Sequence, residues 1–209
     1  QRAFLLFAAL GKIVLELTII SYSATLSACE TGAKWQSALS LLAAMGRVAL
    51  EPNLICYGAA LSACAKGAAC QWALALLASM DQLVVQVDVI CYNAALSACE
   101  KGAEALGLLA AISPAVLEPN VWSYNAALSA CEKGVEWRMA LALLLTMAQV
   151  LEPDNWSYNA AASACEKSGK WQSALALLDA TGQVVLEPDV IGYSAVLSAY
   201  DRCAEWRRA

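Results

Sequence analysis

The fold is decided by residues 124–134, which read YNAALSACEKG. Variants of this stretch recur along the whole chain, each beginning at a tyrosine: Tyr22, Tyr57, Tyr92, Tyr124, Tyr158 and Tyr193. Successive tyrosines are 35, 35, 32, 34 and 35 residues apart. Self-similarity at a fixed period of this size is the mark of a repeat protein, so we expect repeated supersecondary units rather than one globular core.

Each repeat contains two helical patterns. The first runs from the tyrosine to a glycine such as Gly134, which we expect in the left-handed conformation that ends a helix. The second, such as residues 171–180, carries Leu and Ala at helical spacing and must end before Glu187-Pro188. An Asp or Asn then precedes the next repeat and is placed to cap its first helix. The sequence therefore predicts an all-α solenoid of helix-turn-helix repeats of about 35 residues.

The predicted boundaries divide one solenoid domain into seven parts. They are 1–18, the second helix of a partial repeat; 19–53, 54–88, 89–120, 121–154 and 155–189, five repeats; and 190–209, a partial sixth. The third repeat is shortened and carries Gly107 inside its second helix, where glycine costs about 1 kcal/mol relative to Ala. We expect this repeat to be the weak joint. The chain begins without Met and ends partway through a repeat, so we expect it to be a fragment.

The composition excludes several classes of protein. Hydrophobic residues make up 60% of the chain and charged residues 15%, which argues against disorder. The apolar run from Ala3 to Leu10 is too short to span a bilayer, so no membrane association is expected. Five of the nine cysteines share one repeat position and indicate packing as thiols. Without histidine or a Cys-x-x-Cys pair, we expect no metal site, cofactor, small-molecule substrate or catalysis.

These residues resemble the pentatricopeptide repeat family. Its units open with a Val-Thr-Tyr-Asn pattern, turn at Lys-x-Gly, continue with Glu-Ala-Leu and close with Lys-Pro-Asp. Here Tyr-Asn opens three repeats at 92–93, 124–125 and 158–159, and Glu-Pro-Asp or Glu-Pro-Asn closes several of them. Tetratricopeptide repeats have a similar length but lack the Tyr-Asn opening. The resemblance covers nearly the whole chain and implies a right-handed superhelix.

The resemblance also implies binding of single-stranded RNA, one base per repeat. Two residues per repeat select the base: the one after the tyrosine and the last before the next repeat. The implied pairs are Ser23 with Asn53, Gly58 with Asp88, Asn93 with Asn120, Asn125 with Asp154, and Asn159 with Asp189, and the partial repeat adds Ser194. Carried over, they imply the target adenine, any base, pyrimidine, uracil, uracil. Alternatively, these residues act only as local caps.

Two further sets of positions follow from the same resemblance. The residues two before each tyrosine would sandwich the bases, or would pack between repeats instead: Ile20, Ile55, Ile90, Trp122, Trp156 and Ile191. The cations at the end of the first helix would contact phosphates, and also suit the negative end of the helix dipole: Lys66, Lys101, Lys133, Lys167 and Arg202.

The charge balance argues against RNA. The net charge is −5, and acidic residues stand directly before Lys101, Lys133 and Lys167. A solenoid scaffold for protein partners is the competing hypothesis. If RNA is the partner, the family resemblance implies a protein of chloroplasts or mitochondria that serves RNA processing, stability, editing or translation.

Overall fold

The computed structural model describes residues 19–82, 87–112, 118–183 and 190–202. The predicted helix over 1–18 and the base-selecting residue Asp189 lie outside these ranges. Within them the chain is helical and contains no strand, which confirms the all-α fold of helix-turn-helix repeats. No helix in the described ranges is long and apolar enough to cross a membrane. The predicted repeat boundaries remain a prediction.

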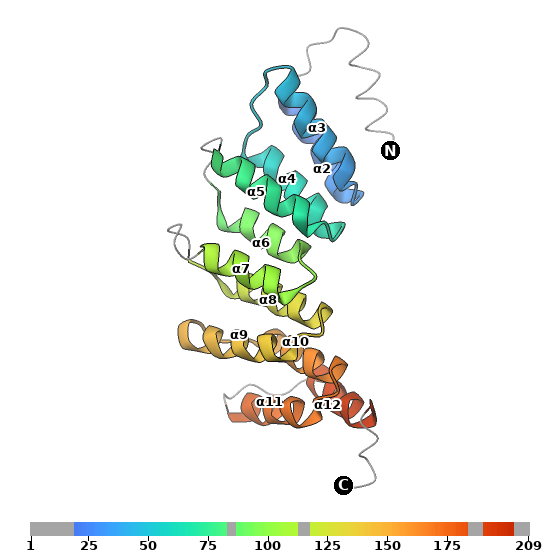
Figure 1. Cartoon of the computed structure of the whole chain (residues 1–209), viewed down its shortest axis with the longest axis vertical. Helices are drawn as coiled ribbons and strands as arrows, with labels where there is room; N and C mark the ends of the chain where they lie inside the picture. Colours follow the sequence, from blue (N-terminus) through green and yellow to red (C-terminus); the bar gives the residue numbers. More distant parts are fainter. Residues whose placement is uncertain (1–18, 83–86, 113–117, 184–189, 203–209) are drawn as a thin grey trace. The chain divides into compact units, whose positions relative to one another are not determined.

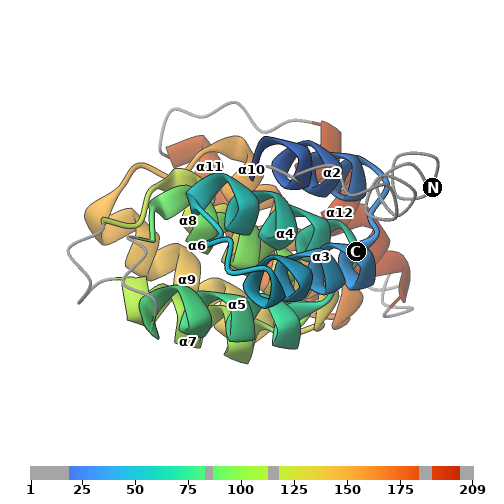
Figure 2. The same ribbon diagram turned by 90° about the horizontal axis from the view of Figure 1, so that it is seen from above.

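The chain divides into two compact units between Ala98 and Cys99, inside the shortened third repeat. The first unit contains α2 (Ile19–Thr31), α3 (Trp35–Arg47), α4 (Leu54–Lys66), α5 (Cys70–Gln82) and α6 (Val89–Ala98). Its first helices pack in series, α2 on α4 and α4 on α6, and each second helix packs beside them. Figure 2 shows α3 below α2 and α5 below α4, so this unit has two layers.

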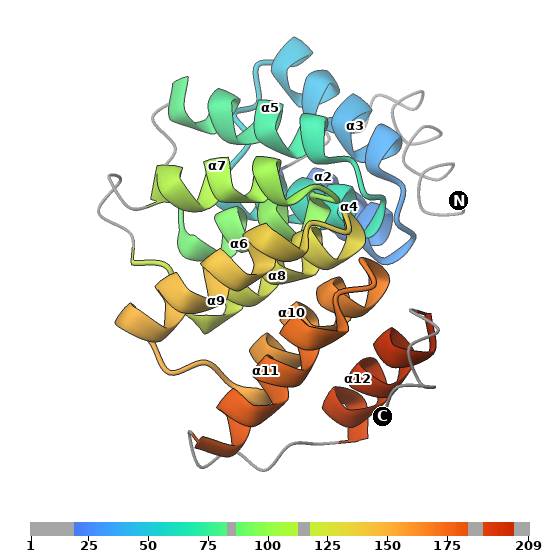
Figure 3. The same cartoon turned by 60° about the horizontal axis from the view of Figure 1, so that its bottom comes forward.

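The second unit contains α7 (Gly102–Ile112), α8 (Val121–Lys133), α9 (Trp137–Val150), α10 (Asn155–Lys167), α11 (Trp171–Gln183) and α12 (Val190–Arg202). Helix α10 packs between α8 and α12, and α11 contacts both α10 and α12. Helix α9 lies beside α7 and α8, as Figure 3 shows. Both units therefore repeat one hairpin arrangement, labelled along the chain in Figure 1.

The core is built from the same repeat positions in both units. In α2, Tyr22, Leu26 and Cys29 are buried on one stripe, and in α3, which packs against α2, Ala38 and Met45 have no exposed surface. The cysteines predicted to pack as thiols are all buried: Cys29, Cys64, Cys99, Cys131 and Cys165. Burial raises the pKa of the Cys64, Cys131 and Cys165 thiols to about 11. They pack as small, neutral, apolar side chains.

The expected role of the turn glycine is wrong. Gly134 has a φ of −75°, so it is not left-handed, and the residue after it, Val135, has a φ of 59° instead. Ala33 and Ala68 occupy the same left-handed position in their repeats. Only in the fifth repeat is this residue a glycine, Gly169, with a φ of 64°.

Close packing against a neighbouring repeat constrains three of these turn glycines instead. A Cβ on Gly67 would collide with the ring of Trp35 in the preceding repeat. On Gly134 it would lie 3.2 Å from the backbone oxygen of Glu100, and on Gly102 it would meet the Sγ of Cys131. The neighbouring repeat approaches closely at these three glycines, although the fifth repeat has a serine at the same position, whose hydroxyl donates to the backbone oxygen of Val135 at 3.2 Å. The sequence pattern singled out the turn glycine for its backbone conformation, whereas the structure shows close packing there.

The predicted caps of the first helices are confirmed where the structure describes them. The side chains of Asn53, Asp88, Asn120 and Asp154 each accept the backbone N–H of the residue three positions later, at 2.8–3.1 Å. At Asn120 and Asp154 a serine reciprocates, so that both helices begin with a complete capping box.

Candidate nucleic-acid interface

One stripe of each first helix carries the residues that the sequence assigned to RNA. In α8 these are Trp122, Asn125 and Lys133, with Ser129 between the last two. Residues three, seven and eleven positions apart return to nearly the same side of a helix, because each residue advances by about 100°. Trp156, Asn159, Ser163 and Lys167 repeat this order on α10. The stripe places an apolar residue at the helix start, an amide one turn later, and a cation at the helix end.

The proposed base-sandwiching residues are all exposed. Ile20 and Ile90 are each 74% exposed, Trp122 is 76% exposed, and Trp156, the least exposed, still shows 48% of its surface. Ile55 and Ile191 are 65% and 61% exposed. Much of the surface of each of these side chains is therefore left uncovered by neighbouring repeats. Each unit thus exposes large apolar side chains at one repeat position.

The structure brings together the predicted base-selecting residues Asn125 and Asp154, across adjacent first helices. The Nδ2 of Asn125 donates to the two carboxylate oxygens of Asp154 at 3.4 and 3.5 Å. The hydroxyl of Ser157, one turn into α10, donates to the Oδ1 of Asn125 at 2.7 Å. It also lies 2.8 Å from the Oδ1 of Asp154. Asn125 is only 8% exposed, whereas Asp154 reaches the surface.

The carboxylate of Asp154 stays ionised in this cluster. Burial by itself raises its pKa, but hydrogen bonds from the backbone and hydroxyl of Ser157 and from the amide of Asn125 outweigh that effect. The net result is a pKa below the ordinary value for aspartate. An ionised carboxylate is an acceptor only, so the cluster presents acceptor oxygens beside an amide donor.

The other predicted base-selecting residues lie at the same helix starts. Asn53, Asp88 and Asn120 cap helices, as expected if these residues act as local caps. Their role in selecting bases stays a prediction. The hydroxyls of Ser23 and Ser194 donate to backbone oxygens within their own helices. Asn93 is half-buried on α6, and a Cβ on Gly58 would meet nothing within 4 Å.

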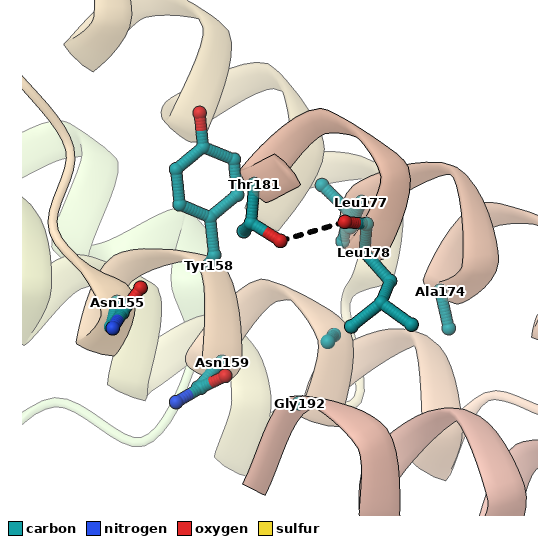
Figure 4. Close-up of a pocket in the computed structure, with 9 residues that line it drawn as sticks. Asn155, Tyr158, Asn159, Ala174, Leu177, Leu178, Thr181 and Gly192 are labelled. Atoms are coloured by element: carbon teal, nitrogen blue, oxygen red, sulfur yellow. Dashed lines mark hydrogen bonds between the residues drawn. The ribbon is translucent and has the colours of Figure 1, made fainter. Parts of the chain in front are cut away.

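Asn159 lines a small pocket between α10, α11 and α12. Figure 4 shows its amide beside Gly192 of α12, whereas Tyr158 lies on the side of Thr181 in α11. The pocket has a volume of about 10 Å³, roughly the space of one water molecule. It is too small for a base, so any base read by Asn159 would have to lie outside it. The partner assigned to Asn159, Asp189, is outside the described residues.

The lysines predicted to contact phosphates are exposed, but two are held by carboxylates of the preceding repeat. Lys66 lies 3.4 Å from Glu30, and Lys167 lies 3.0 Å from Glu132. The Ser163 hydroxyl also donates to Glu132, at 3.0 Å. Among the residues that the structure describes, no ion pair is recorded for Lys101 or Lys133. The side chain of Arg202 lies outside the described part.

Sequence reasoning missed Ser157. Its hydroxyl joins Asn125 to Asp154, residues of two different repeats, and it has no exposed surface. A signal was present: the residue before each repeated tyrosine is Ser, Cys or Gly in every copy. Such small residues at the third position of a helix suit a capping box, but the pattern does not reveal that one of them also contacts the previous repeat.

Comparisons with known proteins agree with this arrangement. A family model described as "Pentatricopeptide repeat domain" matches residues 11–67 and 75–133. The crystal structure of PPR10 from maize is similar over 98% of this chain and 30% of that chain, with 26% identity and a TM-score of 0.79. No curated protein sequence matches this chain.

Two solved structures with lower identity share the fold. PPR10 in complex with an 18-nt psaJ RNA element is 19% identical over 100% of this chain and 36% of that one, with a TM-score of 0.56. The PPR domain of Arabidopsis thaliana protein-only RNase P 1, in complex with tRNA, is 14% identical over 89% and 96%, with a TM-score of 0.65. This chain thus spans 30% of PPR10 in one structure and 36% in the other.

The family model covers more than half of the chain, and the helix-turn-helix repeats follow the fold of its solved relatives. The chain therefore belongs to the pentatricopeptide repeat family.

Proposed function

We propose that this chain binds single-stranded RNA, with one base facing each repeat. The observation that carries the proposal is the pairing of Asn125 with Asp154 at the start of adjacent first helices. Two residues 29 positions apart in sequence form one polar surface, and exposed tryptophans of the same two helices stand beside it. The solved relatives PPR10 and protein-only RNase P 1 were crystallised with RNA, which supports the same class of partner.

The polar pair suits uracil. The Watson–Crick edge of uracil places a carbonyl acceptor next to an N–H donor, and the Asn125–Asp154 pair places an amide donor next to a carboxylate acceptor. Cytosine in the same pose puts an amino group and a ring lone pair where uracil has the carbonyl and the N–H, and so mismatches both. The remaining pairs extend the proposed target to adenine, any base, pyrimidine, uracil, uracil.

Stacking and charge complete the proposed interface. Trp122 and Trp156 each offer a flat apolar surface worth about 1–3 kcal/mol of base stacking. Lys101 and Lys133 are the cations most available to phosphates, because Lys66 and Lys167 are held in ion pairs. With so few phosphate contacts, we expect weak binding at physiological salt. We assign no catalytic step to these residues.

The biological setting proposed is a chloroplast or mitochondrion, where the chain would support processing, stability, editing or translation of a transcript. It follows from family membership and not from a residue of this chain. Because the chain spans only 30% of PPR10, the activity of the whole protein belongs to this proposal as well.

The test is a titration of two labelled oligonucleotides at low salt, one with the proposed base order and one with the same bases scrambled. We expect tighter binding of the ordered oligonucleotide and weaker binding of both at high salt. Replacing Asn125 and Asp154 together by Ala should remove the preference for uracil at the fourth position. Equal binding of the ordered and scrambled sequences by the unchanged chain would refute base reading.

A second candidate, a scaffold for protein partners, has one observation of its own. On α3 and α5, Trp35 and Trp72 lie with ring centroids 6.1 Å apart and line an open groove of uncharged residues. Trp72 is 51% exposed there. This groove lies on second helices, away from the stripe of the first helices. Binding of protein but not of RNA would favour this candidate.

A further inference from the structure

The hydroxyl of Ser157 sits between two acceptors. It lies 2.7 Å from the Oδ1 of Asn125 and 2.8 Å from the Oδ1 of Asp154, and it accepts the backbone N–H of Asp154 at 3.3 Å. Asp154 Oδ1 already accepts the backbone N–H of Ser157 at 2.9 Å and the amide of Asn125. Among the described residues, the Ser157 hydroxyl is the only donor recorded for Asn125 Oδ1. We therefore expect the single hydroxyl proton to be donated mainly to the Oδ1 of Asn125, because the Oδ1 of Asp154 already has other donors.

Together, Ser157 and Asp154 anchor both ends of the Asn125 amide. An ionised carboxylate accepts hydrogen bonds only, so the Nδ2 end must face Asp154, and the Oδ1 end faces Ser157. A rotated amide would turn its oxygen toward the carboxylate and lose both contacts. In the anchored orientation, Oδ1 is turned toward Ser157 and already accepts one hydrogen bond, and the Nδ2 hydrogen that is not directed at Asp154 is the donor for an incoming base.

We propose that Ser157 is a positioning residue that sets the base specificity of the Asn125–Asp154 pair, an inference that rests on the RNA binding proposed above. By holding Oδ1, it stops the amide from offering that oxygen to the amino group of cytosine. Uracil is favoured because the amide presents a donor in one fixed direction. The group of residues that selects the base in one repeat therefore includes a side chain from the next repeat.

The residue at the position of Ser157 differs between repeats, so the proposal makes a prediction for each repeat. It holds Ser21, Cys56, Cys91, Ser123, Ser157 and Gly192. A hydroxyl is a firm donor, a thiol is a weak one, and glycine offers no side chain. Repeats followed by Ser should therefore discriminate between pyrimidines more sharply than repeats followed by Cys or Gly.

The experiment compares Ser157→Ala, Ser157→Thr and Ser123→Ala with the unchanged chain. Binding is measured to RNAs that differ only in the base, uracil or cytosine, opposite Asn125 and Asp154. Ser123 is the matched control, because its hydroxyl completes the capping box of α8 just as Ser157 completes that of α10. Circular dichroism establishes that each variant is folded.

We expect Ser157→Ala to lower the ratio of the two dissociation constants about threefold to tenfold, the effect of losing one neutral hydrogen bond. Ser157→Thr should keep the ratio, and Ser123→Ala should leave it unchanged at this base. An unaltered ratio in Ser157→Ala, or an equal drop in Ser123→Ala, would overturn the proposal. Absence of any base preference in the unchanged chain would instead refute the RNA-binding proposal.

A second measurement needs no RNA. The side-chain amide protons of Asn125 should exchange with water several-fold faster in Ser157→Ala than in the unchanged chain or in Ser123→Ala, as followed by NMR. Equal exchange in all three proteins would show that Ser157 does not hold the amide and would overturn the inference, whatever the outcome of the RNA titrations.

Discussion

At the scale of a single residue, the side chain of Asp154 takes part in three interactions. It caps α10, contacts the Asn125 amide of the previous repeat, and presents acceptor oxygens at the surface. Each hydrogen bond that it accepts favours the ionised carboxylate, so its pKa is lowered although burial opposes this. Capping and base reading, which the sequence left as alternatives, are therefore compatible in one side chain. The structure shows the cap, and base reading remains a proposal.

The lowered pKa of Asp154 predicts a dependence of stability on pH. The folded-state pKa lies below the unfolded value of about 3.9, so the contribution is complete above that value and is lost as the pH falls through the folded pKa. Asp154→Asn keeps an oxygen for the cap but removes the charge. In urea unfolding at pH 7 and pH 3, the variant should lose less stability on acidification than the unchanged chain does. Asp179→Asn, on the exposed side of α11, is the control, and an equal loss in Asp154→Asn and the unchanged chain would contradict the prediction.

The backbone of Val135 is strained. Val135 is a β-branched residue at a φ of 59°, where L-residues cost about 1–2 kcal/mol. Val135→Gly should remove this strain, lose roughly 0.5–1 kcal/mol to greater freedom of the unfolded chain, and stabilise by about 0.5 kcal/mol net. Gly169→Ala introduces a side chain at the same repeat position and should destabilise the fold by about 1 kcal/mol. Chemical denaturation measures both, and a destabilised Val135→Gly would contradict the assigned conformation.

At the scale of elements, the shortened third repeat differs from the others. Its first helix, α6, has 10 residues, whereas α2, α4, α8 and α10 have 13 each. Its second helix, α7, contains two glycines of opposite character. Gly107 faces open space, and Gly102 packs against Cys131 of α8. One glycine weakens the helix, and the other permits its packing.

This contrast predicts opposite effects of one substitution in a single helix. Gly107→Ala should stabilise the fold by about 1 kcal/mol, because alanine is the better helix former and nothing obstructs its Cβ. Gly102→Ala should destabilise it by about 1–3 kcal/mol, the usual cost of overpacking. Thermal unfolding of the two variants compares them directly. Stabilisation by both substitutions would mean that α7 does not pack tightly on α8.

Ion pairs between successive first helices are the second feature at this scale. Glu30 holds Lys66, and Glu132 holds Lys167, in each case across one repeat. If Lys167 contacts phosphate, Glu132 competes with the RNA for the same ammonium group. Glu132→Gln should therefore strengthen RNA binding severalfold at low salt, measured by fluorescence anisotropy. Glu152→Gln, which removes an exposed carboxylate beyond the end of α9, is the control for net charge, and equal gains in both variants would exclude competition.

At the scale of the whole molecule, the charge balance limits how strongly RNA can bind. The chain carries 18 acidic and 13 basic residues, so attraction must come from locally available cations rather than from net charge. The lysines at the ends of the first helices are such cations, but two of the four described ones already have acidic partners. Affinity should therefore depend steeply on the remaining two.

The number of lysine–phosphate contacts can be measured from the salt dependence of RNA binding. For single strands, each phosphate contact adds about −0.7 to the slope of log K against log salt concentration. Replacing Lys101 and Lys133 together by Ala should make the slope less negative by about 1.4, while the order of preference among bases is kept. Replacing Lys34 and Lys170, exposed at the turns, supplies the control for charge. An unchanged slope in the first variant would remove these lysines from the interface.

The sequence by itself determined the period, the two helices per repeat, the buried cysteine position and the caps of the first helices. These features follow from local patterns, because helical spacing, proline and capping residues act within a few positions along the chain. The exposure of Trp122, the packing role of Gly67 and the ion pair of Lys167 were decided only by tertiary structure. So was the anchoring of Asn125 by Ser157. All of these depend on how one repeat is placed against the next, a distance of 30 residues or more in sequence that no local pattern encodes.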